Sequence, residues 1–437
     1  MKKVPLAVQV LIGVGLGILI GETMGKTPLT QNLGDLGLLV IKALRALAVP
    51  LVFFAILDAF IKTRIEGKKL GKLVLICLVN VSVAMLIGLT ILNGFQPGKA
   101  WQGKIQTMLS ATEAKGPEVK KVDDPEAPGA TLELLPNVSY YVPSSLVRPF
   151  VYNNLISVVL LALLIGAALR KVQTEQEAEA EAEEGKRPTI RAVTDFIDAV
   201  YKILLTMLEW VVRAIPYAVF GIVAKVVGAS GSEVFKHLWI FLAVALTGLA
   251  IHSLIYYPLV AYLVGKKTPK EYLGKGADAI LTGLSTNSSL ATVPITLKCL
   301  DRMGVSPASA RIAACVGTNL NNDGITLYEA MAALFLTQAL GIFDQLGPFG
   351  QIRVVLASIM AGAGIAGIPE AGLIVLPLVL GTAGLPPETV ALALPLLVPV
   401  DWIIARVRSG VNVMSDMLVA ILLDAGKKPD VQESVSP

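Results

Sequence analysis

Residues 401 to 416 place charged and amide side chains inside an otherwise apolar segment of the chain. If this segment is a helix, then Asp401, Ala405, Arg408, Asn412 and Asp416 follow one another at intervals of three or four residues and share one face. An ionised side chain at the centre of a bilayer costs about 2.5 to 3.5 kcal/mol on insertion scales, and such residues usually mark a substrate or ion pathway. The spacing therefore predicts a binding site for a charged solute in the protein interior.

A second polar run, Thr318-Asn319-Leu320-Asn321-Asn322-Asp323-Gly324, interrupts another apolar segment. Unwinding of a helix there would expose backbone carbonyls, and Asn321 with Asp323 could complete the small oxygen cage that Na⁺ favours. Asn412 and Asp416 offer oxygens for a second cage. The alternative is that these side chains only cap the ends of broken helices.

These polar clusters lie in a chain with the composition of a membrane protein. Of its 437 residues, 54% are hydrophobic and 16% are charged, against about 25% charged residues in soluble domains. The mean hydropathy is +0.69. We predict six ordinary membrane spans, because six apolar runs can each cross about 30 Å of hydrocarbon: residues 6–24, 36–61, 73–93, 151–169, 192–228 and 237–264.

After about residue 277 the apolar runs become short and are interrupted by Ser, Asn, Gly and Pro. Residues 277–298 and 353–384 each hold a polar or glycine-rich tip between two apolar arms, which predicts two re-entrant helical hairpins. A long helix is predicted after each hairpin, at 306–340 and 389–424. The fold class is thus an all-α integral membrane protein with eight transmembrane helices and two re-entrant hairpins.

Lys and Arg in short loops indicate the orientation, because such loops stay in the cytoplasm. They cluster at the start of the chain, at 62–72, at 266–275 and at 427–428, so both termini are predicted to be cytoplasmic and the protein to be a multi-pass component of the cytoplasmic membrane. The Glu-rich stretch 175–184 is interpreted as a solvated helical extension or a partner-binding surface.

Other residue types give weaker signals. The net charge of +4 gives no reason to expect a nucleic-acid partner, and Cys77, Cys299 and Cys315 show no metal-ligand spacing. His237 and His252 are interpreted as structural residues outside any site.

In the order of its motifs, the chain resembles the dicarboxylate/amino acid:cation symporter family, the relatives of the glutamate transporters. Ser288-Ser289 match the serine-rich tip of the first hairpin, and Asn321 to Ile325 match the signature of the broken seventh helix. Gly367-Ile368 match the tip of the second hairpin, and Asp401, Arg408, Asn412 and Asp416 match the eighth helix. The resemblance implies a homotrimer in which a static scaffold holds a mobile transport domain that works as an elevator.

The resemblance also implies a division of the chain. Residues 1–95 would hold scaffold spans 1 and 2 with transport-domain span 3, and 96–133 an extracellular loop. Residues 134–265 would hold scaffold spans 4 and 5 with transport-domain span 6. Residues 266–437 would form the transport core with both hairpins and helices 7 and 8.

Arg408 matches the arginine that clamps the side-chain carboxylate of an acidic amino acid, which implies a small anionic substrate. Ala405 stands where such transporters carry the aspartate that binds the α-ammonium group, and a methyl group cannot pair with that cation. A C4-dicarboxylate is therefore our first expectation. The predicted substrate contacts are Ser288, Ser289, Ile325, Gly367, Ile368, Gly372, Ala405, Arg408, Ser409 and Asn412.

The resemblance implies Na⁺, H⁺ or both as coupling ions and no other cofactor. One family site would use Gly317, Asn321, Asn412 and Asp416 and looks intact. A second would join Asp323 to span 3, where Cys77, Asn80 and Val81 make a degraded cage. At a site near the second hairpin, Asn319 replaces a threonine. We expect fewer sodium ions than in glutamate transporters, or protonation of Asp323. Arg406 is expected either to shape the field around the anion or to pair with Glu370 or a hairpin carbonyl.

Three other functions were weighed. An amino-acid symporter could bind the ammonium group through Asp401 or Asp416, and an uncoupled uniporter or anion channel would use the same arginine. An intramembrane aspartyl protease would need two paired aspartates, but it leaves Arg408 and both hairpins unexplained. The chain is therefore not expected to be an enzyme.

Overall fold

The computed structural model describes residues 6–62, 67–102, 145–152, 155–182, 188–232, 234–364, 371–385 and 387–425. Every regular element in these ranges is a helix, as the sequence predicts. A helix satisfies its own backbone hydrogen bonds, which is the requirement for a chain that crosses hydrocarbon.

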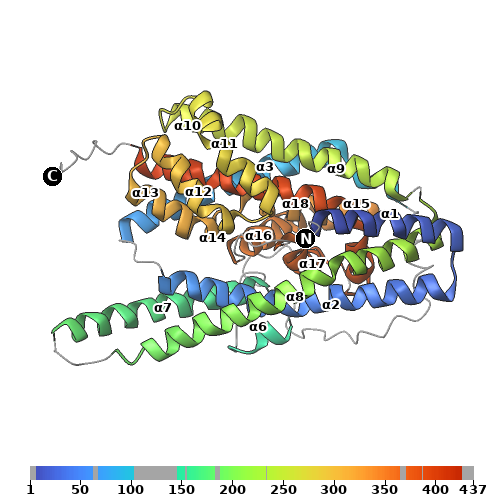
Figure 1. Ribbon diagram of the computed structural model, residues 1–437, viewed down its shortest axis with the longest axis horizontal. Helices are drawn as coiled ribbons and strands as arrows, with labels where there is room; N and C mark the ends of the chain where they lie inside the picture. Colours follow the sequence, from blue (N-terminus) through green and yellow to red (C-terminus); the bar gives the residue numbers. More distant parts are fainter. Residues whose placement is uncertain are drawn as a thin grey trace, which may run out of the picture.

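One group of helices comes from the N-terminal half of the chain. Its members are α1 (Leu6–Met24), α2 (Pro28–Lys62), α7 (Leu155–Ala182) and α8 (Arg191–Ser230). In Figure 1, α2, α7 and α8 lie along the lower side, and α1 lies above the right-hand end of α2. Helix α8 packs against both α1 and α2, and α7 packs against α2. Helix α7 continues through Glu175 to Ala182, so this part of the Glu-rich stretch is helical.

The backbones of α2 and α8 come into direct contact. A Cβ atom built on Gly221 would lie 2.1 Å from the carbonyl oxygen of Leu33, so only glycine fits there. One turn further along α8, Lys225 Nζ donates to Asp35 Oδ1 over 2.7 Å, and the lysine side chain is 9% exposed. Small residues at such a crossing allow the close approach that holds membrane helices together.

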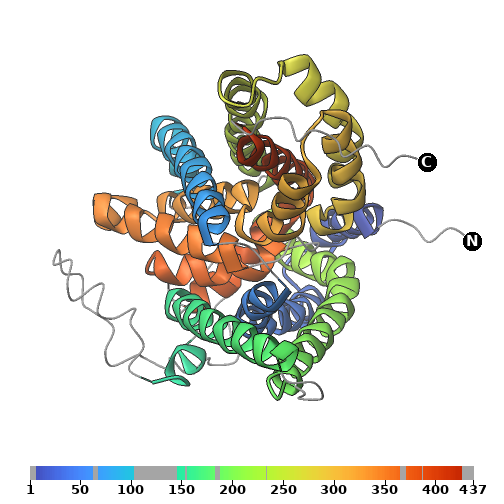
Figure 2. The ribbon, with the colours of Figure 1, turned by 90° about the vertical axis from the view of Figure 1, so that its left-hand side faces the viewer.

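A second group contains α3 (Gly67–Phe95), α9 (Val234–Ala250) and the helices after them. Figure 2 shows α3, in light blue, among the orange helices of the C-terminal half, and α3 packs against α15 (Asp323–Ala339). A π-helical segment, η2 (Ile251–Tyr256), joins α9 to α10 (Tyr257–Leu263). Two short helices complete the elements before residue 153: η1 (Pro97–Trp101) and α6 (Arg148–Val151).

Two helices form a hairpin at the first predicted position. They extend beyond the predicted range, 277–298, at both ends. The hairpin consists of α11 (Pro269–Thr286) and α12 (Ser289–Arg302), which pack against each other. Asn287 ends α11 with a φ of 54°, the left-handed conformation that amide side chains tolerate at a helix terminus. Ser288 begins α12 because its hydroxyl accepts the backbone N–H of Ala291.

The predicted interruption of the next helix is also confirmed. The segment begins with α13 (Pro307–Arg311), continues as the π-helical segment η3 (Ile312–Gly317) and the single turn α14 (Thr318–Leu320), and resumes as α15. Asn321 and Asn322 between α14 and α15 have non-helical ψ angles of 60° and 52°. The break therefore falls at the residues that the sequence singles out.

The second hairpin is described in its two arms, α16 (Phe343–Gly364) and α17 (Ala371–Thr382). Its tip, with the predicted contacts Gly367 and Ile368 and the possible partner Glu370, lies outside the described residues. The last helix, α18 (Pro387–Asp424), is unbroken, so residues 401 to 416 share one helix as predicted.

Five stretches in the described part are helical, long and apolar enough to cross a membrane: Gly71–Phe95, Ser157–Glu181, Arg191–Ala229, Leu238–Leu263 and Phe343–Ala363. The first four coincide with predicted spans three to six, and the fifth is an arm of the second hairpin. Predicted spans one and two give only the shorter stretches Val8–Met24 and Val49–Asp58. The reason in α2 is that Asp35, Lys42 and Arg45 interrupt its apolar sequence.

Candidate functional site

Arg408 is buried where three helices meet, with 1% of the residue exposed. Its Nη2 atom lies 3.1 Å from Asp401 Oδ1, two turns earlier on α18, and its guanidinium carbon lies 4.1 Å from the centre of the Tyr328 ring of α15. A Cβ atom on Gly372 of α17 would lie 2.0 Å from Nη1. The Asp401 carboxylate, the face of the Tyr328 ring and the backbone of Gly372 thus surround the guanidinium group. A buried guanidinium needs such partners.

Three further residues expected at the substrate site have small or apolar side chains. Ala405, one turn before Arg408, is 2% exposed, and Ile325 at the start of α15 is 4% exposed. Neither side chain can pair with an ammonium group. Ser409 is 6% exposed, and its hydroxyl has no hydrogen-bond partner among the described residues. These three residues therefore offer no carboxylate to an ammonium group, and Ser409 offers a spare hydroxyl next to Arg408 in the sequence.

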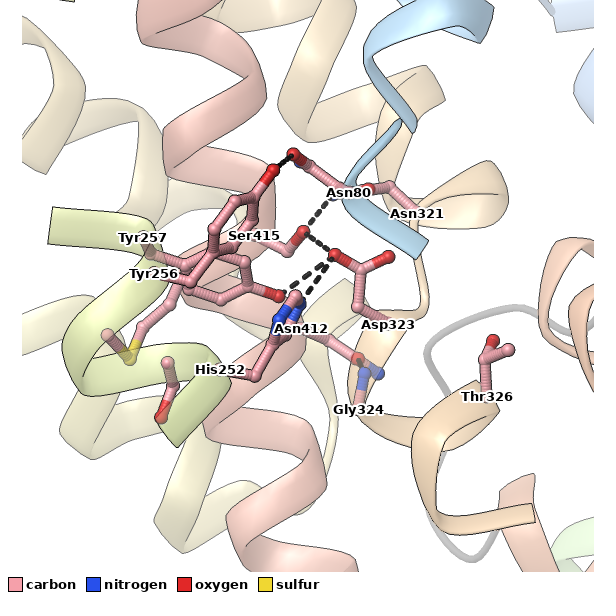
Figure 3. A network of polar contacts seen from close by, with 12 residues as sticks. Asn80, His252, Tyr256, Tyr257, Asn321, Asp323, Gly324, Thr326, Asn412 and Ser415 are labelled. Carbon is pink, nitrogen blue, oxygen red and sulfur yellow. Dashed lines mark hydrogen bonds and ion pairs between the residues drawn. The ribbon is translucent and has the colours of Figure 1, made fainter. Parts of the chain in front are cut away.

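A second centre forms around Asp323, which is 1% exposed (Figure 3). Its Oδ2 atom accepts hydrogen bonds from Ser415 Oγ at 2.7 Å and Tyr257 Oη at 2.9 Å, and His252 Nε2 lies 3.4 Å away. These partners come from α18, α10 and η2. One carboxylate oxygen thus joins three segments that lie far apart in the sequence.

Side-chain amides hold the broken helix in place. Asn412 Oδ1 accepts the backbone N–H of Gly324 at 2.9 Å, and Asn412 Nδ2 donates to Asn322 Oδ1 at 3.1 Å. Asn322 Nδ2 donates to the carbonyl oxygen of Gly362 in α16 at 2.9 Å. The break is therefore fastened on one side to α18 and on the other to the second hairpin.

Three buried oxygens of this region accept no hydrogen bond within the described part of the chain. They are Oδ1 of Asn321, Oδ1 of Asp323 and Oδ1 of Asp416, and each residue is at most 2% exposed. The carboxyl group of Asp416 lies beside the side chains of Thr318 and Asn321. Buried acceptors normally have partners, and oxygens left in this state fit the ligands of a hard cation.

The predicted residues of the first hairpin are buried, but their hydroxyls already have partners. Ser288 caps α12, and Ser289 Oγ accepts a hydrogen bond from Thr318 Oγ1 at 3.3 Å. Ser289 therefore links the hairpin tip to α14, next to the helix break. Gly317 ends η3 directly before α14, and the side chain of Asn319 within α14 lies outside what the structure describes.

Asn80 of α3 and Arg406 of α18 each have a described contact with an aromatic residue. Asn80 Oδ1 accepts a hydrogen bond from Tyr256 Oη at 3.0 Å. The guanidinium group of Arg406 lies over the Trp402 ring at 4.6 Å, and its Nη1 donates to the Trp402 carbonyl at 3.0 Å. Arg406 thus contacts its own helix.

Several residues of the site were not found from the sequence. His252, expected from the sequence to be outside any site, lies on the π-helical segment η2 with its ring near Asp323. Ser415 was also missed, although it directly precedes Asp416 on α18. Glu329 is fully buried on α15, interacts electrostatically with Arg408, and has no hydrogen-bond partner among the described residues. Its signal in the sequence is a lone carboxylate in an apolar run, six residues after Asp323.

Comparison with known proteins shows which family the sequence resembles. The sequence profile of the sodium:dicarboxylate symporter family matches residues 6–425. Human excitatory amino acid transporter 3 is 24% identical over 97% of this chain and 85% of its own length. An excitatory amino acid transporter of Caenorhabditis elegans is 31% identical over 78% of this chain and 64% of its own length.

A further relative, mouse excitatory amino acid transporter 3, is 32% identical over 55% of this chain and 45% of its own length. The mouse and nematode matches thus span less than two thirds of those relatives. The family profile covers nearly the whole chain, and the family contains transporters and not enzymes. The chain belongs to the sodium:dicarboxylate symporter family.

Proposed function

We propose that this protein is a sodium-coupled symporter for an acidic substrate and that Arg408 binds a substrate carboxylate. The observation that carries the proposal is the burial of the Arg408 guanidinium between Tyr328, Asp401 and Gly372. A planar, permanently charged donor at that position suits bidentate binding of a carboxylate. The substrate would compete with Asp401 for the same guanidinium.

The coupling ion in this proposal is Na⁺, held near the break between α14 and α15. Asn321, Asp416 and Asp323 each have an oxygen without a hydrogen-bond partner there, and Asn412 fixes the adjacent backbone. When bound, Na⁺ would supply positive charge among these oxygens. The family description, which names sodium, supports this choice over a proton alone.

An acidic amino acid, glutamate or aspartate, is the first candidate for the substrate. This choice reverses the order expected from the last helix, because the relatives are excitatory amino acid transporters. A C4-dicarboxylate remains the second candidate, favoured by the buried methyl group of Ala405 one turn before Arg408.

The proposed working unit is a homotrimer in the cytoplasmic membrane with both termini in the cytoplasm. Within each protomer, α1, α2, α7 and α8 would form a scaffold, and α3, α9 and the later helices would form a transport domain that moves as an elevator. The closer packing of α8 against α1 and α2 than of any of these helices against the later ones supports this division. Their membership follows the residue ranges expected from the sequence.

Uptake into liposomes tests the proposal. Purified protein would be reconstituted, and uptake of labelled aspartate measured with inward Na⁺, inward H⁺ or no gradient, with succinate, malate and glutamate as competitors. We expect Na⁺-dependent uptake that glutamate inhibits more strongly than succinate. Stronger inhibition by succinate or malate would select the second candidate. Equal uptake without any cation gradient would contradict symport.

A further inference from the structure

Ser415 stands between two residues of the proposed cation site (Figure 3). Its Oγ atom accepts a hydrogen bond from Asn321 Nδ2 at 2.6 Å and donates one to Asp323 Oδ2 at 2.7 Å. The serine is fully buried on α18. Its hydroxyl therefore bridges the side chains on the two sides of the helix break.

The direction of these two hydrogen bonds is fixed by chemistry. The amide nitrogen of Asn321 can only donate, so Ser415 Oγ accepts that hydrogen bond and directs its own single proton to Asp323 Oδ2. Because the amide nitrogen faces Ser415, the Asn321 oxygen must lie on the other side of the amide group. Of the two carboxylate oxygens of Asp323, only Oδ1 then has no hydrogen-bond donor. The Asn321 and Asp323 oxygens are two of the three buried oxygens near the helix break that accept no hydrogen bond from a described residue.

An ordinary helical serine would be bonded differently. The hydroxyls of Ser253 and Ser358, both buried, donate to carbonyl oxygens four residues earlier in their own helices, at 2.7 and 2.8 Å. Ser415 instead directs its hydroxyl out of α18 and into the break. Its side chain thus organises another segment and does not only fill space in its own helix.

We propose that Ser415 is a positioning residue of the cation site. It orders Asn321 and Asp323 so that one oxygen of each is available to the ion, while its own hydroxyl is used in the bridge. This inference rests on the proposed sodium coupling. Without the hydroxyl, the amide of Asn321 can turn over and Asp323 loses its shortest hydrogen bond, so sodium should bind more weakly.

The test compares wild type, Ser415→Ala and Ser415→Thr, with Ser358→Ala as the control for loss of a buried hydroxyl. Sodium binding is followed without substrate, as the rise in thermal unfolding temperature when Na⁺ replaces choline. We expect Ser415→Ala to raise the half-saturating Na⁺ concentration about tenfold, the effect of losing one hydrogen bond to a charged group. Ser415→Thr, which keeps the hydroxyl, and Ser358→Ala should stay within about twofold of wild type.

A second measurement distinguishes a positioning role of Ser415 from a general loss of protein structure. At saturating Na⁺, substrate affinity of Ser415→Ala should equal that of wild type, because Arg408 is untouched. If Ser415→Ala does not fold, Ser415→Cys, a weak hydrogen-bond donor, replaces it in the same titration. Unchanged or tighter sodium binding in the variant would overturn the inference. If wild type itself shows no sodium response, the proposed coupling fails, and that result is seen before any variant is compared.

Discussion

The guanidinium group of Arg408 lies directly against the backbone of Gly372, where an added Cβ atom would be 2.0 Å from Nη1 and 2.5 Å from the guanidinium carbon. The two residues come from α18 and from the second arm of the second hairpin. On its other sides the guanidinium contacts Tyr328 and Asp401, so it has little room to move away. The position of the proposed substrate-binding charge therefore requires a glycine, which has no side chain, at residue 372 of α17.

Gly372→Ala should weaken substrate binding while sodium binding stays unchanged. The methyl group must push the guanidinium out of place, and a misplacement of about 1 Å can cost on the order of 100-fold in function. Calorimetric titration with substrate at saturating Na⁺ measures the effect. Gly381→Ala is the matched control, because a Cβ atom on that glycine of the same helix meets nothing within 4 Å. Equal substrate affinity in the two variants would refute the dependence on Gly372.

Removing the charge of Arg408 alone should destabilise the protein as well as abolish binding. Arg408→Gln leaves Asp401 buried without its partner, which costs about 3 to 5 kcal/mol. Adding Asp401→Asn removes the unpaired charge, so the double variant should regain much of its thermal stability without regaining substrate binding. Thermal unfolding and substrate titration of both variants provide the check. Recovery of binding in the double variant would show that Arg408 is not the anion ligand.

Ala405→Asp should raise the affinity for aspartate relative to the affinity for succinate. The new carboxylate would lie one turn before Arg408, where it can pair with a buried ammonium group, and we expect the ratio of the two affinities to change about tenfold or more. Competition in the uptake assay measures that ratio. Ala405→Asn is the control of equal size without the charge. A similar shift with asparagine would show that the added volume, not the ammonium pairing, is responsible.

Asp416→Asn should weaken sodium binding at the helix break. Asp416 Oδ1 is buried and accepts no hydrogen bond from any described residue, and the substitution removes the charge that would face the ion. We expect the half-saturating Na⁺ concentration to rise at least about tenfold, as for loss of a charged ligand. The exposed Asp301→Asn on α12 is the control. No change with Asp416→Asn would place the ion elsewhere.

The stability that the N-terminal cap of α11 contributes should decrease in acid. Thr268 and Glu271 form a reciprocal cap, and the backbone N–H of Thr268, then Lys275, lower the pKa of the Glu271 carboxyl. A lowered pKa means that the carboxylate contributes stability above its ordinary pKa of 4.5 and loses it as the pH falls through the folded-state value. Glu271→Ala should therefore lower the unfolding temperature at pH 7 and converge with wild type in acid. A difference that persists in acid would contradict this account.

The sequence predicts the elements of the site whose signal is local. Charges spaced along one helical face identified α18, and a run of amides before glycine identified the break at Asn321 and Asn322. Both patterns follow from helix geometry and from the cost of polar groups in hydrocarbon. They could be recognised without knowing which segments are neighbours.

The contacts around Asp323 could not be predicted in this way. Tyr257 and His252 reach one carboxylate oxygen only because a π-helical segment changes the rotation of the chain between α9 and α10, and because this region packs beside α18. Neither the wider turn nor the packing has a periodic signature in the sequence. Ser415 shows the same limit, since only the fold reveals that its hydroxyl faces Asn321.

The contact between Gly221 and the Leu33 carbonyl has a mechanical consequence. Two helices that touch through their backbones cannot slide or rotate past one another without first separating, and the ion pair between Lys225 and Asp35 fastens the same crossing. In the elevator motion that we propose, helices α2 and α8 would therefore behave as one rigid body. The displacement of Arg408 across the bilayer would then be taken up along the boundary between the two helix groups.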